Sequence, residues 1–126
     1  MKFLCIAYEE ERKLNELSQA EWHALRKETL AYVDGLRTRG TLITAHPLQS
    51  ATTASMVRVR SGKLTVTDGP FAETKEQIGG FFLIEADDRD EAIRIAAAWP
   101  SARIGSIEVR PVDEELRLDS RYRRQG

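Results

Sequence analysis

The sequence has little of the residue types that cross-link small domains or hold metals. Cys5 is the one cysteine among 126 residues, which excludes an internal disulfide and a cysteine-rich zinc site. Its place inside an apolar run favours a small core residue over a nucleophile. The two histidines, His23 and His46, lie 23 positions apart, a spacing that matches no recognised metal site. Because phosphate loops and dinucleotide fingerprints are also absent, we expect no metal and no cofactor.

Long apolar runs and an excess of either charge are absent as well. No run approaches the roughly 20 residues that span a bilayer, and the first residues lead into glutamates without a cleavage site. We therefore expect a cytoplasmic protein that does not contact membranes. The 19 basic and 20 acidic side chains leave a net charge of -1, which argues against nucleic acid as a partner.

What the sequence does contain is an alternation of strand and helix patterns. Ser18 and Glu21 form a capping box at the start of an amphipathic segment, and Gly40 supplies a left-handed end. Asp88 begins a second helical pattern that Pro100 ends. Apolar runs or alternating residues predict strands at 2–8, 41–45, 56–60, 63–67, 81–86 and 105–110.

The strands at 56–60 and 63–67 flank Ser61 and Gly62, which have the form of a two-residue hairpin turn. Their alternation predicts that one face packs and the other meets water. Without this hairpin, the order of elements is that of an α+β, ferredoxin-like βαββαβ fold. The strands at 2–8 and 81–86 are apolar on both faces, as the two central strands of that fold should be.

Two helices can cover one face of such a sheet, so the other face should need a partner. We expect the set Phe3, Cys5 and Ala7 to point one way and Leu4, Ile6 and Tyr8 the other way. The same alternation separates Phe82 and Ile84 from Phe81 and Leu83. We therefore expect a homodimer with sheets packed face to face. The alternative is that the hairpin, or the charged extension at 113–126 that follows a domain at 1–112, folds over the open face.

One segment carries a specific family resemblance. Residues 66–76 contain Asp68, Gly69, Pro70 and Phe71, and this segment resembles the DGPF signature of the YCII-related family. The stretches 57–60, 62–63, 77–84 and 107–111 also look like members of that family, so the likeness spans about residues 1–112.

The resemblance implies a dimeric α/β-barrel protein. Some members are small enzymes that use a histidine and an aspartate in a cleft, and DGPF-type members are often encoded beside extracytoplasmic-function sigma factors. In the enzymes the histidine lies in the first helix, at a position near Thr29 here, and His23 stands six residues earlier.

The resemblance and the residue chemistry together give a candidate site. Asp68 and His46 are the candidate catalytic residues, a carboxylate and an imidazole suited to proton transfer. Candidate ligand-binding residues are Gly69, Pro70, Phe71, Glu73 and Lys75, of which Lys75 could bind an anionic group. Each has a structural alternative: Asp68 can cap its own turn, Phe71 can anchor the loop, His46 can end its strand, and Glu73 and Lys75 can lie in solvent.

These patterns lead to two hypotheses of function. The first is a small-molecule cleft near the 68–71 loop with acid/base chemistry on a small organic substrate. The second is a non-enzymatic module that senses a ligand or binds a protein such as a sigma factor. A dimeric scaffold without any ligand is a third possibility.

Overall fold

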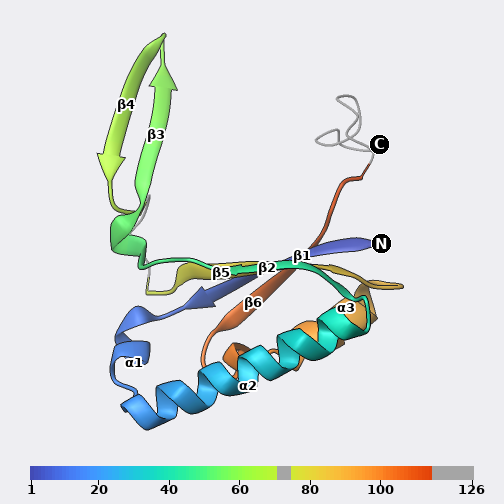
Figure 1. Ribbon diagram of the computed structural model, residues 1–126. Helices are drawn as coiled ribbons and strands as arrows, with labels where there is room; N and C mark the ends of the chain where they lie inside the picture. Colours follow the sequence, from blue (N-terminus) through green and yellow to red (C-terminus); the bar gives the residue numbers. More distant parts are fainter. Residues whose placement is uncertain (71–74, 115–126) are drawn as a thin grey trace.

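The computed structural model describes residues 1–70 and 75–114, in which a four-stranded antiparallel sheet carries helices on one face (Figure 1). The elements in chain order are β1 (Lys2–Glu9), α1 (Glu11–Asn15), α2 (Gln19–Thr38), β2 (Leu42–Pro47), the 3₁₀ helix η1 (Ala51–Thr53), β3 (Ser55–Arg60), β4 (Lys63–Asp68), β5 (Gln77–Glu85), α3 (Arg89–Ala97), the 3₁₀ helix η2 (Pro100–Arg103) and β6 (Ser106–Pro111). Within the described ranges, no helix combines the length and apolarity needed to cross a bilayer.

The strand order is β2-β5-β1-β6, with every neighbouring pair antiparallel. This order confirms the α+β, ferredoxin-like prediction, including the central position of the two strands that are apolar on both faces. The hairpin of β3 and β4 forms a separate two-stranded sheet, as its turn residues predicted.

The core lies between the sheet and the helices. Phe3, Cys5, Phe82 and Ile84 point toward the helices and are at most 1% exposed, whereas their strand neighbours on the open face are only half-buried. Trp99 stacks on Phe82 with ring centroids 3.7 Å apart. Burial raises the pKa of the Cys5 thiol to about 12. The expected alternation and the core role of Cys5 are both confirmed.

The helix ends follow the capping pattern. The Ser18 hydroxyl accepts from the Glu21 backbone at 3.1 Å, and the Glu21 carboxylate accepts from the Ser18 backbone at 3.0 Å. Gly40 adopts a φ of 75°, which completes the left-handed end of α2. Asp88 caps α3 through the backbone of Glu91. Helix α1 was not anticipated, because five residues are too few to show a helical period.

Strand β5 begins four residues earlier than predicted. The pair Gly79 and Gly80 precedes the predicted strand, but both residues lie inside the observed one. The pairing with β1 shifts between Ala7 and Tyr8, where the register skips Gly79. The two glycines therefore do not end the strand. They allow the Glu9 carboxyl group and the His46 carbonyl to lie close to the β5 backbone.

The β3–β4 hairpin projects from the sheet on the side away from the helices (Figure 1). Ser61 and Gly62 have φ values of 50° and 73°, as a two-residue turn with a mirror-image backbone requires. We expected one face of the hairpin to pack, but every residue of β4 is exposed. In the described part of the chain, the hairpin therefore does not cover the open face of the sheet.

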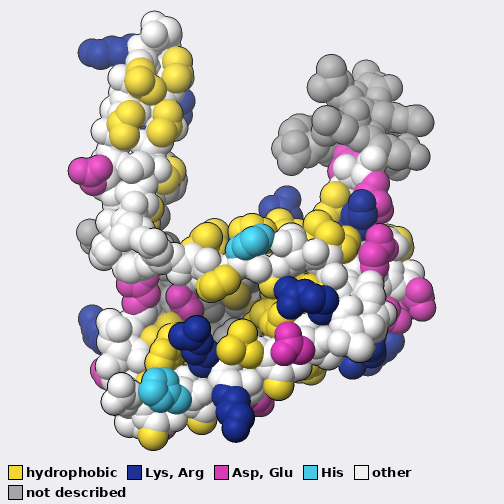
Figure 2. Space-filling model, viewed as in Figure 1, with side chains coloured by type: hydrophobic (Ala, Val, Ile, Leu, Met, Phe, Trp, Pro, Cys, Tyr) yellow, Lys and Arg dark blue, Asp and Glu magenta, His cyan; other side chains and the backbone are white. Residues whose placement is uncertain are grey.

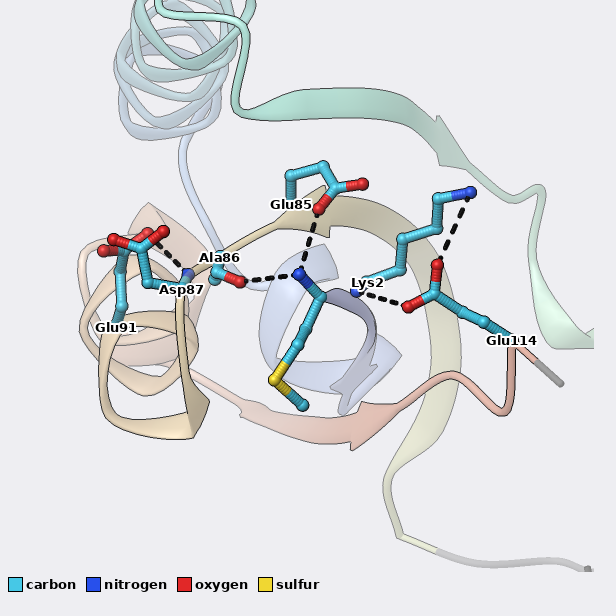
Figure 3. Close-up of polar contacts among 7 residues, drawn as sticks. Lys2, Glu85, Ala86, Asp87, Glu91 and Glu114 are labelled. Carbon is cyan, nitrogen blue, oxygen red and sulfur yellow. Dashed lines mark hydrogen bonds and ion pairs between the residues drawn. The ribbon is translucent and has the colours of Figure 1, made fainter.

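The first residues after β6 return to the start of β1. The backbone of Val112 donates to Lys2 at 2.9 Å, and the Glu114 carboxylate accepts from the Lys2 backbone at 3.4 Å and lies 3.9 Å from its ammonium group (Figure 3). Residues 115–126 of the expected extension lie outside the described residues.

Candidate functional site

A cavity of about 560 Å³ lies between α2 and the sheet. Its wall is mostly apolar, and Figure 2 shows the molecule hollowed between these two layers. Helix α2 contributes Trp22, Leu25, Thr29 and Val33, which lie on one side of the helix. This volume falls within the ~300–1,000 Å³ that is usual for small-molecule sites.

The cavity exists because the sheet presents small side chains beneath the first half of α2. Ala7, Gly80 and Pro47 pair across three neighbouring strands at this end of the helix-covered face. The other end carries the large core residues. The apolar stripe of α2 is therefore only partly covered: Leu36 is its one fully buried residue, and Trp22 remains 44% exposed.

Two polar contacts hold α2 in place above this space. Arg103 in η2 donates to both carboxylate oxygens of Glu28, at 2.8 and 2.7 Å, and this hydrogen-bonded guanidinium lowers the pKa of Glu28. The Tyr32 hydroxyl donates to the Ile95 carbonyl at 2.7 Å. The helix is thus tied to η2 and α3 rather than packed onto small residues of the sheet.

Glu9, the last residue of β1, places a carboxyl group in the cavity wall. The carboxyl group lies directly against the Cα of Gly79, in the space that a Cβ there would fill. Burial raises the pKa of Glu9, and the nearby negative charge of Glu11 raises it further. A half-buried carboxyl group with a raised pKa keeps its proton to a higher pH than an ordinary glutamate and can serve as a proton donor or acceptor.

Glu11 is fixed beside this group by a neighbouring loop. Its carboxylate accepts from the Ser50 hydroxyl at 2.8 Å and from the Ala51 backbone at 2.7 Å, which joins α1 to η1. The charge that influences Glu9 therefore has a defined position.

Cationic groups lie at the α2 side of the cavity. Arg26 and Arg37 both line it, and Arg37 is 3.7 Å from the Asp34 carboxylate. The polar groups of the site thus comprise a carboxyl group with a raised pKa at the end of β1 and guanidinium groups on α2. Such a wall suits an apolar molecule with a polar or acidic substituent.

Of the residues that the sequence suggested, His46 lines this cavity. Its imidazole Nε2 is 2.7 Å from the Thr44 hydroxyl, and its ring lies 5.6 Å from that of Phe81. Phe81 points away from the helices, since its neighbour Phe82 is in the core. The imidazole of His46 is therefore on the open face of the sheet. His46 lines the cavity through the β2 strand itself and not through its ring.

The other suggested residues lie in or beside the loop after β4. Asp68 is exposed at the base of the hairpin, opposite Ser55, and the Gly69 backbone donates to the Ala54 carbonyl at 2.7 Å. Pro70 is half-buried and Lys75 is exposed. None of these four is among the described residues that line the cavity. Phe71 and Glu73 lie outside the described residues.

The position that the resemblance assigned to a histidine does face the cavity. Thr29 lines it, and its hydroxyl donates to the Leu25 carbonyl at 2.8 Å. His23 is exposed and is not among the lining residues. Glu9 was missed because it was interpreted as the charged end of a strand. The available signal was its alternation with Phe3, Cys5 and Ala7, which puts Glu9 on the helix-covered face.

Comparisons with known proteins agree with this architecture. A protein of Rhizobium meliloti (strain 1021), itself uncharacterised, is 34% identical over 114 residues, which cover 89% of this chain and 92% of that protein. The structure of 5-chloro-2-hydroxyhydroquinone dehydrochlorinase (TftG) from Burkholderia phenoliruptrix AC1100, in complex with 2,5-dihydroxybenzoquinone, is similar in fold. Its TM-score is 0.55, with 17% identity over 89% of this chain and 93% of that one.

The model of the YCII-related domain matches residues 1–115, a range that includes every described residue. The chain therefore belongs to the YCII-related family.

Proposed function

We propose that this protein binds a small, largely apolar organic molecule between α2 and the sheet, and that Glu9 exchanges a proton with it. The observation that carries this proposal is the carboxyl group with a raised pKa in the wall of an apolar cavity. A protonated Glu9 can give its proton to a basic oxygen or carbon of the ligand, and the resulting carboxylate can take a proton back.

The fold neighbour supports small-molecule chemistry on this scaffold. That protein is a dehydrochlorinase of a chlorinated hydroxyhydroquinone, and its structure holds a dihydroxybenzoquinone. We infer an aromatic or similarly flat substrate for this chain as well, because Trp22 and Phe82 both line its cavity. The roles of Asp68, His46 and the other residues of the DGPF segment remain a separate prediction from the sequence and the family resemblance.

We also propose that the functional unit is a homodimer formed through the open faces of two sheets. The half-buried Leu4, Ile6, Phe81 and Leu83 form an apolar surface on the face opposite the helices. Such a contiguous surface is unusual on a monomer in water. An association with a sigma factor stays a prediction from the family resemblance alone.

The test is ligand-dependent thermal stabilisation with two probes, phenol and benzoate, which share a ring and differ in charge. We expect at least one probe to raise the melting temperature of the wild type. The same probe should raise the melting temperature of Glu9→Gln by a smaller amount. Glu16→Gln is the matched control, since Glu16 is exposed and does not line the cavity. Equal stabilisation of the wild type and Glu9→Gln would remove Glu9 from the site.

Turnover distinguishes an enzyme from a sensor. We expect the wild type, and not Glu9→Gln, to accelerate hydrogen–deuterium exchange at an acidic carbon of a bound cyclic ketone or hydroquinone. Binding without any acceleration would favour the ligand-sensing alternative.

A further inference from the structure

The β3–β4 hairpin has one apolar face that the cavity and its chemistry do not explain. Val57 lies opposite Val66, and Val59 opposite Leu64, so the four side chains share a face of the two-stranded sheet. These side chains are 56% to 63% exposed. The other face carries Met56, Arg58, Arg60, Lys63, Thr65 and Thr67.

The hairpin is well formed although nothing in the described chain covers it. Its tip has the positive φ angles of a tight turn, and a backbone hydrogen bond from Gly69 to Ala54 closes its base. A two-stranded hairpin is at best marginally stable in water by itself. A one-sided apolar hairpin therefore indicates a surface that is covered in the assembled protein.

The position of the hairpin identifies what can cover it. It rises from the sheet on the side of the open face, away from the helices (Figure 1). The chain thus carries two uncovered apolar surfaces on the same side, namely the hairpin face and the open sheet face. A molecule seated on the open face would meet the hairpin at its side.

We propose that the hairpin is an arm that packs its apolar face on a second copy of this chain seated against the open sheet face. This inference rests on the proposed homodimer. A two-fold pair uses both arms at once, so that each copy clasps the other and no arm is left uncovered.

The extent of the surfaces favours a second copy. A stable interface buries about 800 Å² on each partner, which is more than four aliphatic side chains can supply. The arm and the sheet face together offer a larger apolar area, and both are present on every copy. The formal net charge of -1 also means that two copies do not repel each other strongly.

The experiment measures the dimer dissociation constant by sedimentation equilibrium, with the 14.3 kDa chain mass as the reference for a monomer. The arm variant is Val59→Thr with Leu64→Thr, which removes one apolar cross-strand pair but keeps residues of high strand propensity. The matched control is Arg60→Thr with Lys63→Thr, the neighbouring pair on the polar face. The sheet variant is Leu4→Thr with Leu83→Thr, a paired position on the open face.

We expect a wild-type dimer, at least a tenfold rise in the dissociation constant for the arm and sheet variants, and no comparable change for the control. If the sheet variant dissociates and the arm variant does not, the homodimer stands and the arm inference is wrong. A wild type that stays monomeric from micromolar to submillimolar concentration overturns both. Far-ultraviolet circular dichroism verifies that each variant is folded, and phenol and benzoate titrations test the cavity separately.

Discussion

The carboxyl group of Glu9 on β1 occupies the space that a Cβ at Gly79 on β5 would fill. Glu9 can therefore hold this position only because residue 79 is a glycine. The two strands are paired here, and the register shift after Ala7 places Gly79 beside Glu9. This contact fixes the carboxyl group at the cavity wall and restricts its access to water, which raises its pKa.

We expect Gly79→Ala to displace the Glu9 carboxyl group with little loss of stability, about 1 kcal/mol or less, because the end of a flexible side chain can swing aside. Stabilisation by the phenol or benzoate probe should fall as it does in Glu9→Gln. Thermal unfolding with and without the probe measures both effects. Unchanged stabilisation in Gly79→Ala would show that the position of Glu9 is irrelevant to binding.

Gly80→Ala should behave differently. A Cβ at position 80 would lie 2.9 Å from the His46 carbonyl oxygen and 3.2 Å from the Pro47 Cα, and these backbone atoms cannot move without shifting β2. We expect a loss of roughly 1–3 kcal/mol in the free energy of unfolding, measured by urea denaturation. A loss no larger than that of Gly79→Ala would contradict this account.

Glu9 should also make stability depend on pH. Its pKa is higher in the folded protein than the ordinary value of about 4.3, so between these two values the folded state binds more protons than the unfolded state. The contribution of Glu9 to the free energy of unfolding is thus fully present below the ordinary value and is lost as the pH rises through this window. Glu9→Gln should therefore gain stability relative to the wild type as the pH rises from the ordinary value through the pKa of Glu9 in the folded protein.

The measurement is the melting temperature of both proteins across this pH range, with Glu16→Gln for comparison. A difference between Glu9→Gln and the wild type that stays constant with pH, or that moves in the opposite direction, would contradict a raised pKa at Glu9.

Filling the cavity should abolish binding without unfolding the protein. Ala45 is half-buried in the wall, and leucine there would extend into the cavity. We expect Ala45→Leu to weaken probe binding more than tenfold and to leave the free energy of unfolding within about 1 kcal/mol of the wild type. Calorimetric titration measures the affinity. Ala97→Leu, on the exposed side of α3, should bind the probe as the wild type does.

The Cys5 thiol should be unreactive toward thiol reagents in the native state. The thiol is fully buried, so a reagent cannot reach it. Burial also raises its pKa to about 12, so very little reactive thiolate is present. We expect no modification by a thiol-specific reagent in native buffer and complete modification in denaturant. Rapid native labelling would mean that β1 opens locally from the sheet.

The sequence was sufficient to predict those parts of the fold that depend on local chemistry. The Ser18–Glu21 box and Gly40 set the ends of α2, and alternation separated Cys5 and Phe82 from their outward neighbours. The helix ends depend on residues that are a few positions apart. The alternation of side chains along a strand does not depend on which strand pairs with it.

The candidate site could not be predicted in the same way, because it depends on long-range register. Glu9 becomes a cavity residue only when β1 is paired with β5 and Gly79 is placed beside it. Likewise, the amphipathic pattern of α2 does not reveal the space beneath the helix. That space exists because Ala7 and Gly80 come together across strands that are far apart in sequence.

The two tryptophans differ in their exposure to water. Both line the cavity, but Trp22 remains 44% exposed, whereas Trp99 is buried against Phe82 and Tyr32. Their fluorescence should therefore separate two events in one sample. A molecule entering the cavity should quench or blue-shift the emission of Trp22, and only loss of the core should expose Trp99. With Trp22→Phe and Trp99→Phe to assign each signal, the protein provides an optical titration of its own cavity without any added label.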